Sequence, residues 1–175
     1  MIADDNQAAY EYTPPLAGPS AAVNRSFYSI VPQGYVYNNK QGVATFHPSR
    51  INSIVDSGTF SLYAPPVVAS GYLASFDPPP IYREDYYGLN FVPCNTTAPY
   101  FGVKIAGTVF NVSSADIVLP TFSYVNSTTG VKYCFINIVD QSFAPFPILG
   151  DAFLNNVVAV FDRGAEMMRF APHSY

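Results

Sequence analysis

The strongest candidate for chemistry in this sequence is an aspartate that directly follows two β-branched apolar residues. Ile54 and Val55 predict the end of a buried strand, and Asp56 comes next. A carboxylate in such a place is costly unless it is hydrogen-bonded. The following Ser-Gly-Thr, residues 57–59, supplies two short hydroxyl donors and a glycine that permits a sharp turn. The pattern predicts one carboxylate held at the floor of a cleft, with an ordinary Asx-type turn as the alternative.

A serine nucleophile is a rival interpretation of the same residues. Asp56-Ser57-Gly58 is similar to the nucleophile motif of chymotrypsin-like enzymes, but the flanking glycines of that motif are missing here. Only His47 and His173 could act as the base, and neither has the surroundings of a catalytic histidine. We therefore expect both histidines to lie on the surface.

The other aspartates give weaker patterns. Asp162 is followed by Arg163, which would put a long cation where a small hydroxyl is needed. Asp151 is expected to cap a short helix, and Asp116 and Asp140 are expected to be solvated loop carboxylates. No His, Cys, Asp or Glu spacing suits a metal, and no glycine-rich loop follows a strand as phosphate binding requires. The sequence therefore implies neither a metal nor a cofactor.

The composition predicts a single all-β domain. The 175 residues are 49% apolar and only 11% charged, and they include 14 Tyr, 14 Phe, 16 Pro and 11 Gly. Such a chain is typical of short strands separated by turns. A net charge of −4 without any Lys/Arg cluster argues against nucleic-acid binding. No apolar run approaches the roughly 18 residues of a membrane span.

Several features indicate an extracellular, secreted or vacuolar protein. The acidic N-terminus lacks the form of a secretory signal, so we expect the true beginning of the protein to lie elsewhere. The two cysteines predict either one disulfide or two buried thiols. Four glycosylation sequons begin at Asn24, Asn95, Asn111 and Asn126.

The order of turns and apolar runs predicts the elements around Asp56. A helix is expected after Pro65-Pro66, because Val68, Tyr72 and Phe76 recur every four residues. Residues 88–94 and 100–105 are expected to form a hairpin, and 108–112 and 132–136 to add strands. Near the C-terminus, a strand that breaks at glycine into a short helix (146–154) and a hairpin (157–161 with 167–170) are expected.

Four blocks of the sequence, in this order, resemble the C-terminal lobe of pepsin-like aspartic peptidases of the fungal kind. The blocks are residues 54–59, the span from Cys94 to Cys134, residues 101–107 with 112–116, and residues 147–154 through 160–162 to 169–171. The resemblance covers nearly the whole chain and implies one all-β, barrel-like lobe with short helices over residues 1–175. It also implies a disulfide between the two cysteines and places the N-terminal lobe outside this sequence.

The resemblance assigns roles to the residues of the first block. It makes Asp56 a catalytic carboxylate, and it makes Gly58 and Thr59 hydrogen-bond donors to that carboxylate. Ser57 would fasten the loop to the loop of a partner lobe. Ile54 would line a substrate pocket on the primed side.

The last block would support that loop. By resemblance, Ile148, Leu149 and Gly150 form a strand that threads beside the catalytic loop in a ψ-shaped arrangement, and glycine permits the close approach. Phe60 departs from the family pattern, because a second small hydroxyl usually stands there.

The implied function is the hydrolysis of peptide bonds at acidic pH by a water molecule activated between two aspartates. Asp56 would be one, and the other would come from an N-terminal lobe or from a second copy across a two-fold axis. The substrate would be a peptide or protein, and the isolated chain would be inactive or weak. The alternative is an inactive lobe that binds peptide or protein in the manner of an inhibitor-like module.

Overall fold

The computed structural model describes residues 27–144, 146–162 and 167–173, and it consists mainly of strands. The helices are α1 (Pro66–Leu73), α2 (Ser114–Ile117), α3 (Asp151–Leu154) and the 3-10 turn η1 (Gln141–Phe143). The first strands are β1 (Ser29–Ile30), β2 (Gly34–Asn38), β3 (Ala44–Pro48), β4 (Ser53–Val55), β5 (Leu62–Ala64), β6 (Ile81–Arg83), β7 (Leu89–Pro93) and β8 (Phe101–Ile105). The others are β9 (Thr108–Val112), β10 (Val118–Val125), β11 (Lys132–Ile136), β12 (Ile138–Asp140), β13 (Ile148–Leu149), β14 (Val157–Asp162) and β15 (Met167–Pro172).

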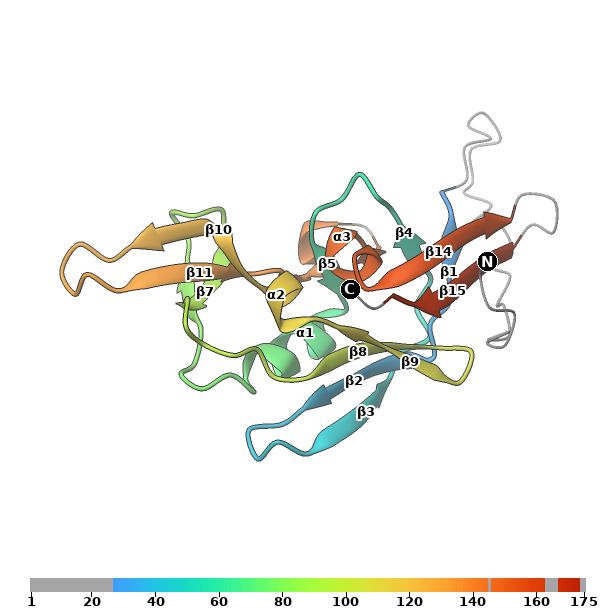
Figure 1. Cartoon of the computed structure of the whole chain (residues 1–175), viewed down its shortest axis with the longest axis horizontal. Coiled ribbons are helices and arrows are strands. Elements are labelled where there is room, and N and C mark those ends of the chain that lie inside the picture. The colour runs from blue at the N-terminus through green and yellow to red at the C-terminus, as the bar shows by residue number, and fades with distance from the viewer. Residues whose placement is uncertain (1–26, 145, 163–166, 174–175) are drawn as a thin grey trace.

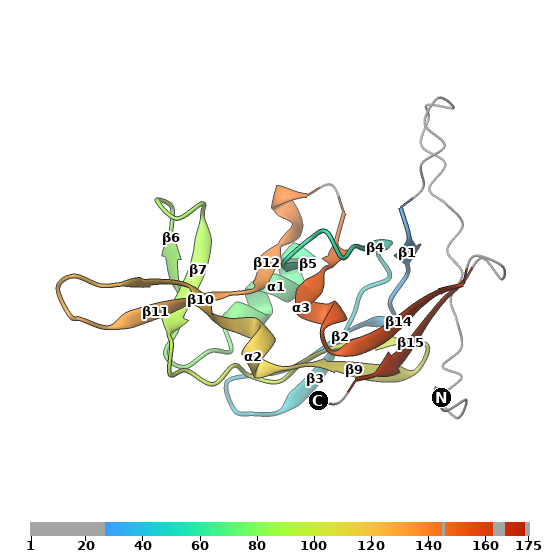
Figure 2. The same cartoon turned by 45° about the horizontal axis from the view of Figure 1, so that its top comes forward.

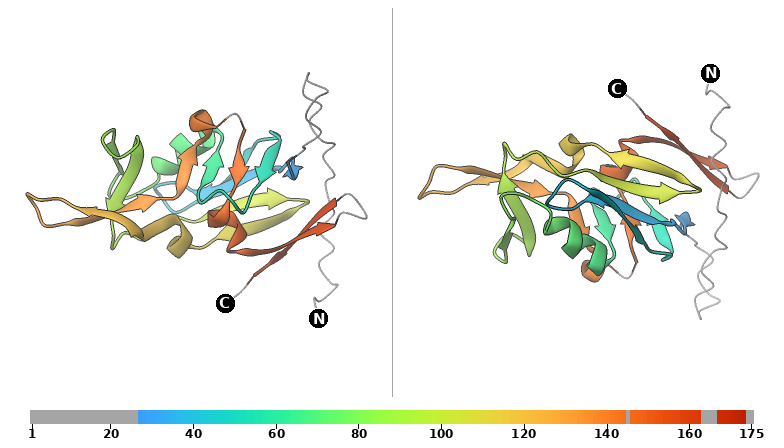
Figure 3. Two further views of the ribbon diagram at one scale, coloured as in Figure 1. Left: turned by 90° about the horizontal axis from the view of Figure 1, so that it is seen from above. Right: turned by 90° about the horizontal axis from the view of Figure 1, so that it is seen from below.

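The described strands form four open sheets, which confirms the all-β prediction. Their strand orders are β1-β4-β13-β5-β12, β3-β2-β8-β9, β10-β11-β7-β6 and β14-β15. The β10–β11 hairpin projects at one end of the long axis and the β14–β15 hairpin lies near the other end (Figure 1, Figure 2). The five-stranded sheet lies between these ends, as the views from above and below also show (Figure 3).

The predicted helix is present as α1. Pro66 stands in its first turn, where the missing N–H is not needed. Val68 and Tyr72 are buried on one face, and Phe76, just beyond the helix, is buried as well. This face packs against β2, β5 and β12, so the four-residue spacing marked the side of the helix that covers the core.

The core is largely aromatic. Tyr35, Tyr72 and Phe101 are fully buried, and the rings of Tyr72 and Phe101 meet edge-to-face with centroids 4.7 Å apart. A second, smaller cluster around Phe91 and Phe135 lies in the β10-β11-β7-β6 sheet. In the described part of the chain, no helix has the length and hydropathy needed to cross a membrane.

The expected hairpin between residues 88–94 and 100–105 is wrong. β7 pairs with β6 and β11, whereas β8 pairs with β2 and β9 in a different sheet. The physical reason lies in the segment between them. The N–H of Cys94 donates to the carbonyl of Lys132, and the disulfide ties Cys94 to β11, so the chain leaves one sheet and enters another.

The disulfide between Cys94 and Cys134 is confirmed, with the two Cα atoms 4.8 Å apart. Cys134 lies on β11 opposite Val92 of β7 and is fully buried. The predicted C-terminal hairpin is confirmed as well, since β14 and β15 pair antiparallel along six residues.

Candidate active-site loop

The residue at the centre of the site, Asp56, follows the C-terminal end of β4. Val55 lies opposite Leu149 of β13, and the strands run parallel. The backbone N–H of Asp56 continues this ladder by donating to the carbonyl of Leu149 at 3.2 Å. The strand therefore fixes the backbone of the aspartate up to the residue that carries the carboxylate. Beyond it, the loop that connects β4 to β5 projects from the sheet (Figure 1).

Both carboxylate oxygens of Asp56 accept a hydrogen bond from the loop itself. The hydroxyl of Thr59 donates to Oδ2 at 2.6 Å, and the backbone N–H of Gly58 donates to Oδ1 at 2.9 Å. The Thr59 hydroxyl, and then the Gly58 N–H, lower the pKa of Asp56, while its burial opposes them. The loop thus holds a half-buried carboxylate in its ionised form.

The strand β13 lies between β4 and β5, so residues 148–149 run through the middle of the arrangement. Ile148 faces Ile54 on one side and Tyr63 on the other, and Leu149 is fully buried. The chain thus leaves the sheet at Asp56 and returns at β5, with a distant segment inserted between the two strands.

Gly150 brings the start of α3 against the far arm of the loop. The N–H groups of Asp151 and Ala152 donate to the carbonyls of Thr59 at 2.8 Å and Phe60 at 3.2 Å. These are first-turn N–H groups, which have no partner inside a helix. A Cβ at Gly150 would lie 2.2 Å from the Thr59 carbonyl oxygen and 2.4 Å from that of Ser61. Only glycine fits between the loop and the helix.

A residue missed by the sequence analysis, Asn137, also holds this arm. Its side chain is 2% exposed, and Nδ2 lies within hydrogen-bonding distance of the carbonyls of Phe60 at 3.3 Å and Asp116 at 3.2 Å. The backbone carbonyl of Asn137 accepts from the N–H of Leu62 at 3.1 Å. In the sequence, the only sign of this role is an asparagine between two apolar runs, and that pattern does not indicate which carbonyls the side chain binds.

The remaining residues of the expected site lie around the loop without binding the carboxylate. The hydroxyl-bearing Ser57 is exposed, and Ile54 is half-buried beside β13. Phe60, which stands where the resemblance expects a hydroxyl, is 53% exposed.

Three expectations for other polar residues need correction. Asp151 is the first residue of α3 and its side chain makes no cap hydrogen bond; the cap position belongs to Gly150. Asp116 is not simply solvated, because its oxygens accept from the amides of Asn155 at 2.9 Å and Asn156 at 3.0 Å. His47 is half-buried, because its ring stacks on Tyr37 with centroids 4.0 Å apart. The other residues of β3 are exposed, and nothing in their sequence indicated that His47 stacks on a ring of β2.

The other candidates fall at scattered places. His173 is exposed, and Asp162 ends β14 with an ion pair to Arg169 at 3.2 Å. Of the sequons, Asn95 and Asn111 are exposed and Asn126 is half-buried, while Asn24 lies outside the described residues. Across residues 27–173, apart from the gaps stated above, no three His, Cys, Asp or Glu side chains gather as a metal site would require.

Several known proteins are similar to this chain in sequence. A probable aspartic-type endopeptidase of Aspergillus fumigatus is 43% identical over 147 residues, which are 83% of this chain and 32% of the relative. Aspergillopepsin-1 of Emericella nidulans is 32% identical over 78% of this chain and 35% of its own length. Endothiapepsin of Cryphonectria parasitica is 29% identical over 86% of this chain and 33% of its own length. The chain therefore spans about a third of the length of these relatives.

The family model of eukaryotic aspartyl proteases matches residues 19–173, which include the Asp56 loop and the strand that threads it. Because the match extends over most of the sequence, the chain belongs to the eukaryotic aspartyl protease family.

Proposed function

We propose that this chain, over residues 1–175, is the C-terminal lobe of an aspartic endopeptidase, and that Asp56 is one of its two catalytic carboxylates. The observation that carries the proposal is the loop itself: a carboxylate at the end of a buried strand, with each oxygen held by one donor. Each carboxylate oxygen has a second lone pair, so both can still accept a proton from water or from a second acid.

The chemistry follows from the shared proton of two adjacent carboxylates. Like charges a few ångströms apart cannot both ionise cheaply, so one acid stays protonated at acidic pH. The ionised member takes a proton from a water molecule, and the oxygen of that water attacks the peptide carbonyl. The protonated member donates toward the carbonyl oxygen and stabilises the negative charge that develops there. No residue becomes covalently attached to the substrate.

The lowered pKa of Asp56 supports the proposal that a second lobe contributes the other acid. Alone, the carboxylate stays ionised at mildly acidic pH, because the Thr59 hydroxyl and the Gly58 N–H favour the charged form. An isolated ionised carboxylate has no acid beside it to polarise the substrate. We propose that an N-terminal lobe supplies the second aspartate, with a second copy of this chain as the less favoured source.

The exposed residues beside the loop fit this assignment. The Ser57 hydroxyl is exposed and makes no hydrogen bond to the described residues of this lobe, which suits a hydroxyl that fastens a partner loop. Ile54 would line a pocket on the primed side of a bound peptide. Phe60, 53% exposed, would present an aromatic surface where relatives of this family present a hydroxyl.

The decisive experiment measures acid-pH hydrolysis of a denatured protein substrate, together with the native mass. The chain alone is expected to be inactive or weak. Mixed with the separately produced N-terminal lobe of the Aspergillus fumigatus relative, it should gain activity that Asp56→Asn lowers by about 10²–10⁴-fold. Glu84→Gln, at an exposed position away from the loop, is the control for the loss of one acid and should leave the rate unchanged.

Strong Asp56-dependent cleavage by a strict monomer would refute the need for a second lobe. Retained peptide binding, with no cleavage under any pairing of lobes, would instead support the inactive binding module. The first outcome is read from the native-mass and activity measurements, and the second from a peptide-binding titration of the same samples.

We also propose that the protein is secreted or vacuolar and carries glycans. The supporting observations are the exposed sequon residues Asn95 and Asn111 and the disulfide. Asn126 is held in a turn, since its Oδ1 accepts from the N–H groups of Thr128 and Thr129 at 2.9 and 3.1 Å. Expression in a fungal host and mass measurement before and after glycan removal tests the proposal; an unchanged mass contradicts it.

A further inference from the structure

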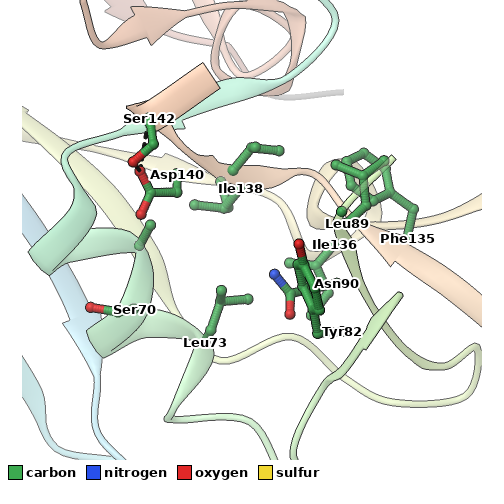
Figure 4. Close-up of a pocket in the computed structure, with 13 residues that line it drawn as sticks. Ser70, Leu73, Tyr82, Leu89, Asn90, Phe135, Ile136, Ile138, Asp140 and Ser142 are labelled. Atoms are coloured by element: carbon green, nitrogen blue, oxygen red, sulfur yellow. Dashed lines mark hydrogen bonds between the residues drawn. The ribbon is translucent and has the colours of Figure 1, made fainter. Parts of the chain in front are cut away.

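A small cavity lies between α1 and the strands β6, β7 and β12 (Figure 4). Its volume is about 260 Å³. Leu73 and Ser70 of α1 line one side, and Asn90 of β7 and Tyr82 of β6 line the other. Ile138 and Asp140 of β12 close it along the sheet.

The cavity is separate from the Asp56 loop. No residue of the loop lines it. In the five-stranded sheet β12 is three places from β4, about 14 Å at the usual strand spacing. Strand direction separates them further. β4 and β13 run in one direction, and β5 and β12 run in the opposite direction. Asp140 therefore lies at the opposite end of the strands from Asp56.

The charge in the cavity has a single sign. Among the described residues that line the cavity, Asp140 is the only acid and there is no Lys, Arg or His. Its Oδ1 accepts both bonds from Ser142, from the N–H at 2.7 Å and from the hydroxyl at 2.6 Å. Within the described residues, no donor binds Oδ2. A carboxylate oxygen left open at the rim of an apolar cavity favours a cation.

The opposite side of the cavity offers a second polar group. The side-chain amide of Asn90 faces the space across from Leu73 (Figure 4). No hydrogen bond occupies this amide in the part of the chain that is described. Leu73 and Ile138 provide apolar surface between the two polar groups. A ligand that fits has a cationic head, an aliphatic stem and an amide.

The size of the cavity selects one residue rather than a larger molecule. At about 260 Å³ it falls just below the usual range of roughly 300–1,000 Å³ for small-molecule sites. We propose that this cavity binds one lysine or arginine residue of a peptide. The cation contacts Asp140, the methylene stem lies on Leu73 and Ile138, and the peptide group meets Asn90.

The inference does not depend on catalysis, so binding is measured directly on the whole chain. The probes are N-acetyl-lysine N-methylamide and N-acetyl-norleucine N-methylamide, which have stems of similar length but differ in charge. Backbone amide shifts of α1 and β12 follow each titration. We expect the lysine probe to bind saturably and about tenfold more tightly than the norleucine probe, because it can make one charge-assisted hydrogen bond that norleucine cannot.

Variants assign the difference to one carboxylate. Asp140→Asn keeps an acceptor for Ser142 and should lower the affinity for the lysine probe to that for the norleucine probe. Glu84→Gln loses the same charge at an exposed place outside the cavity and should leave both affinities unchanged. Asp56→Asn should also leave them unchanged, which separates this site from the proposed catalytic one.

Equal affinity for the two probes, no saturation by the lysine probe, or an Asp140→Asn variant that binds as the wild type does would each overturn the proposal. Folding of the variants is checked from the dispersion of the same amide spectra.

Discussion

Two aspartates end strands of the same sheet, and their immediate surroundings are alike. Asp56 follows β4 and Asp140 ends β12, and each accepts from the N–H two residues ahead and from a nearby hydroxyl. The difference lies beyond the local turn. Beyond the strand, the Asp56 loop is held by β13, Gly150 and Asn137, all distant in sequence. The backbone of Asp140 pairs with Ala64 of β5, but within the described residues its carboxylate accepts only from Ser142. A local pattern can create such a turn, but only distant segments add further hydrogen bonds and packing to it.

Among variants that test this comparison, Gly150→Ala should lower the free energy of unfolding most. The added Cβ would overlap two backbone carbonyls, which cannot move aside as a side chain would. We expect a loss of about 3 kcal/mol or more in the free energy of unfolding, measured by urea titration. Gly130→Ala is the control: nothing lies within 4 Å of its Cβ, although its φ of +70° adds a backbone strain that Gly150, with a φ of −88°, does not have. Equal losses for the two variants would show that close packing at Gly150 is not what matters.

Asn137→Ala comes next. It removes the donor shared by the Phe60 and Asp116 carbonyls and opens a small cavity. The expected loss is about 2 kcal/mol, because two part-buried carbonyls lose the same donor. Hydrogen exchange should speed up at Ala152 and Leu62, which border the loop. If exchange rises equally over η1, beside Asp140, the two regions are not independent.

Thr59→Val and Ser142→Ala test the two hydroxyls directly. Removing the Thr59 hydroxyl should cost about 1 kcal/mol, because a hydrogen bond to a carboxylate is lost at a partly buried site. Ser142 is exposed, and its loss should change the unfolding free energy by less than about 0.5 kcal/mol. A carboxyl titration by NMR should show the pKa of Asp56 rising in Thr59→Val. A reversed order of the two losses would contradict the comparison.

The smallest expected effect is the pH dependence of Asp56. Its folded pKa is lowered, so the ionised group adds stability above the unfolded pKa of about 3.9 and loses it as the pH falls through the folded value. Asp56→Asn should therefore destabilise slightly at neutral pH, by less than about 1 kcal/mol because the group is half-exposed, and not at all at the acid extreme. A difference that persists unchanged to pH 2 would contradict this assignment.

The sequence predicted the elements whose signals are local. The four-residue spacing from Val68 gave α1, and the glycine break at Gly150 gave the strand-to-helix turn. Resemblance supplied the pairing of the cysteines. What failed was pairing between distant segments: β8 joins β2 rather than β7, and β12 went unpredicted because three residues carry too little pattern.

The site divided in the same way. The donors to Asp56 could be expected from residues 57–59, because they lie within the turn. Asn137 and the two α3 amides could not, since nothing at those positions indicates which carbonyls they meet.

The insertion of β13 between β4 and β5 has a consequence for the order of events during synthesis. Residues 54–62 leave the ribosome before the segment that completes their hydrogen bonding, which follows roughly 90 residues later. Until that segment emerges, β4 and β5 lack their common neighbour, and Asp56 has no backbone partner on β13. A nascent chain stopped before residue 148 should therefore carry the aspartate without the strand that supports its loop.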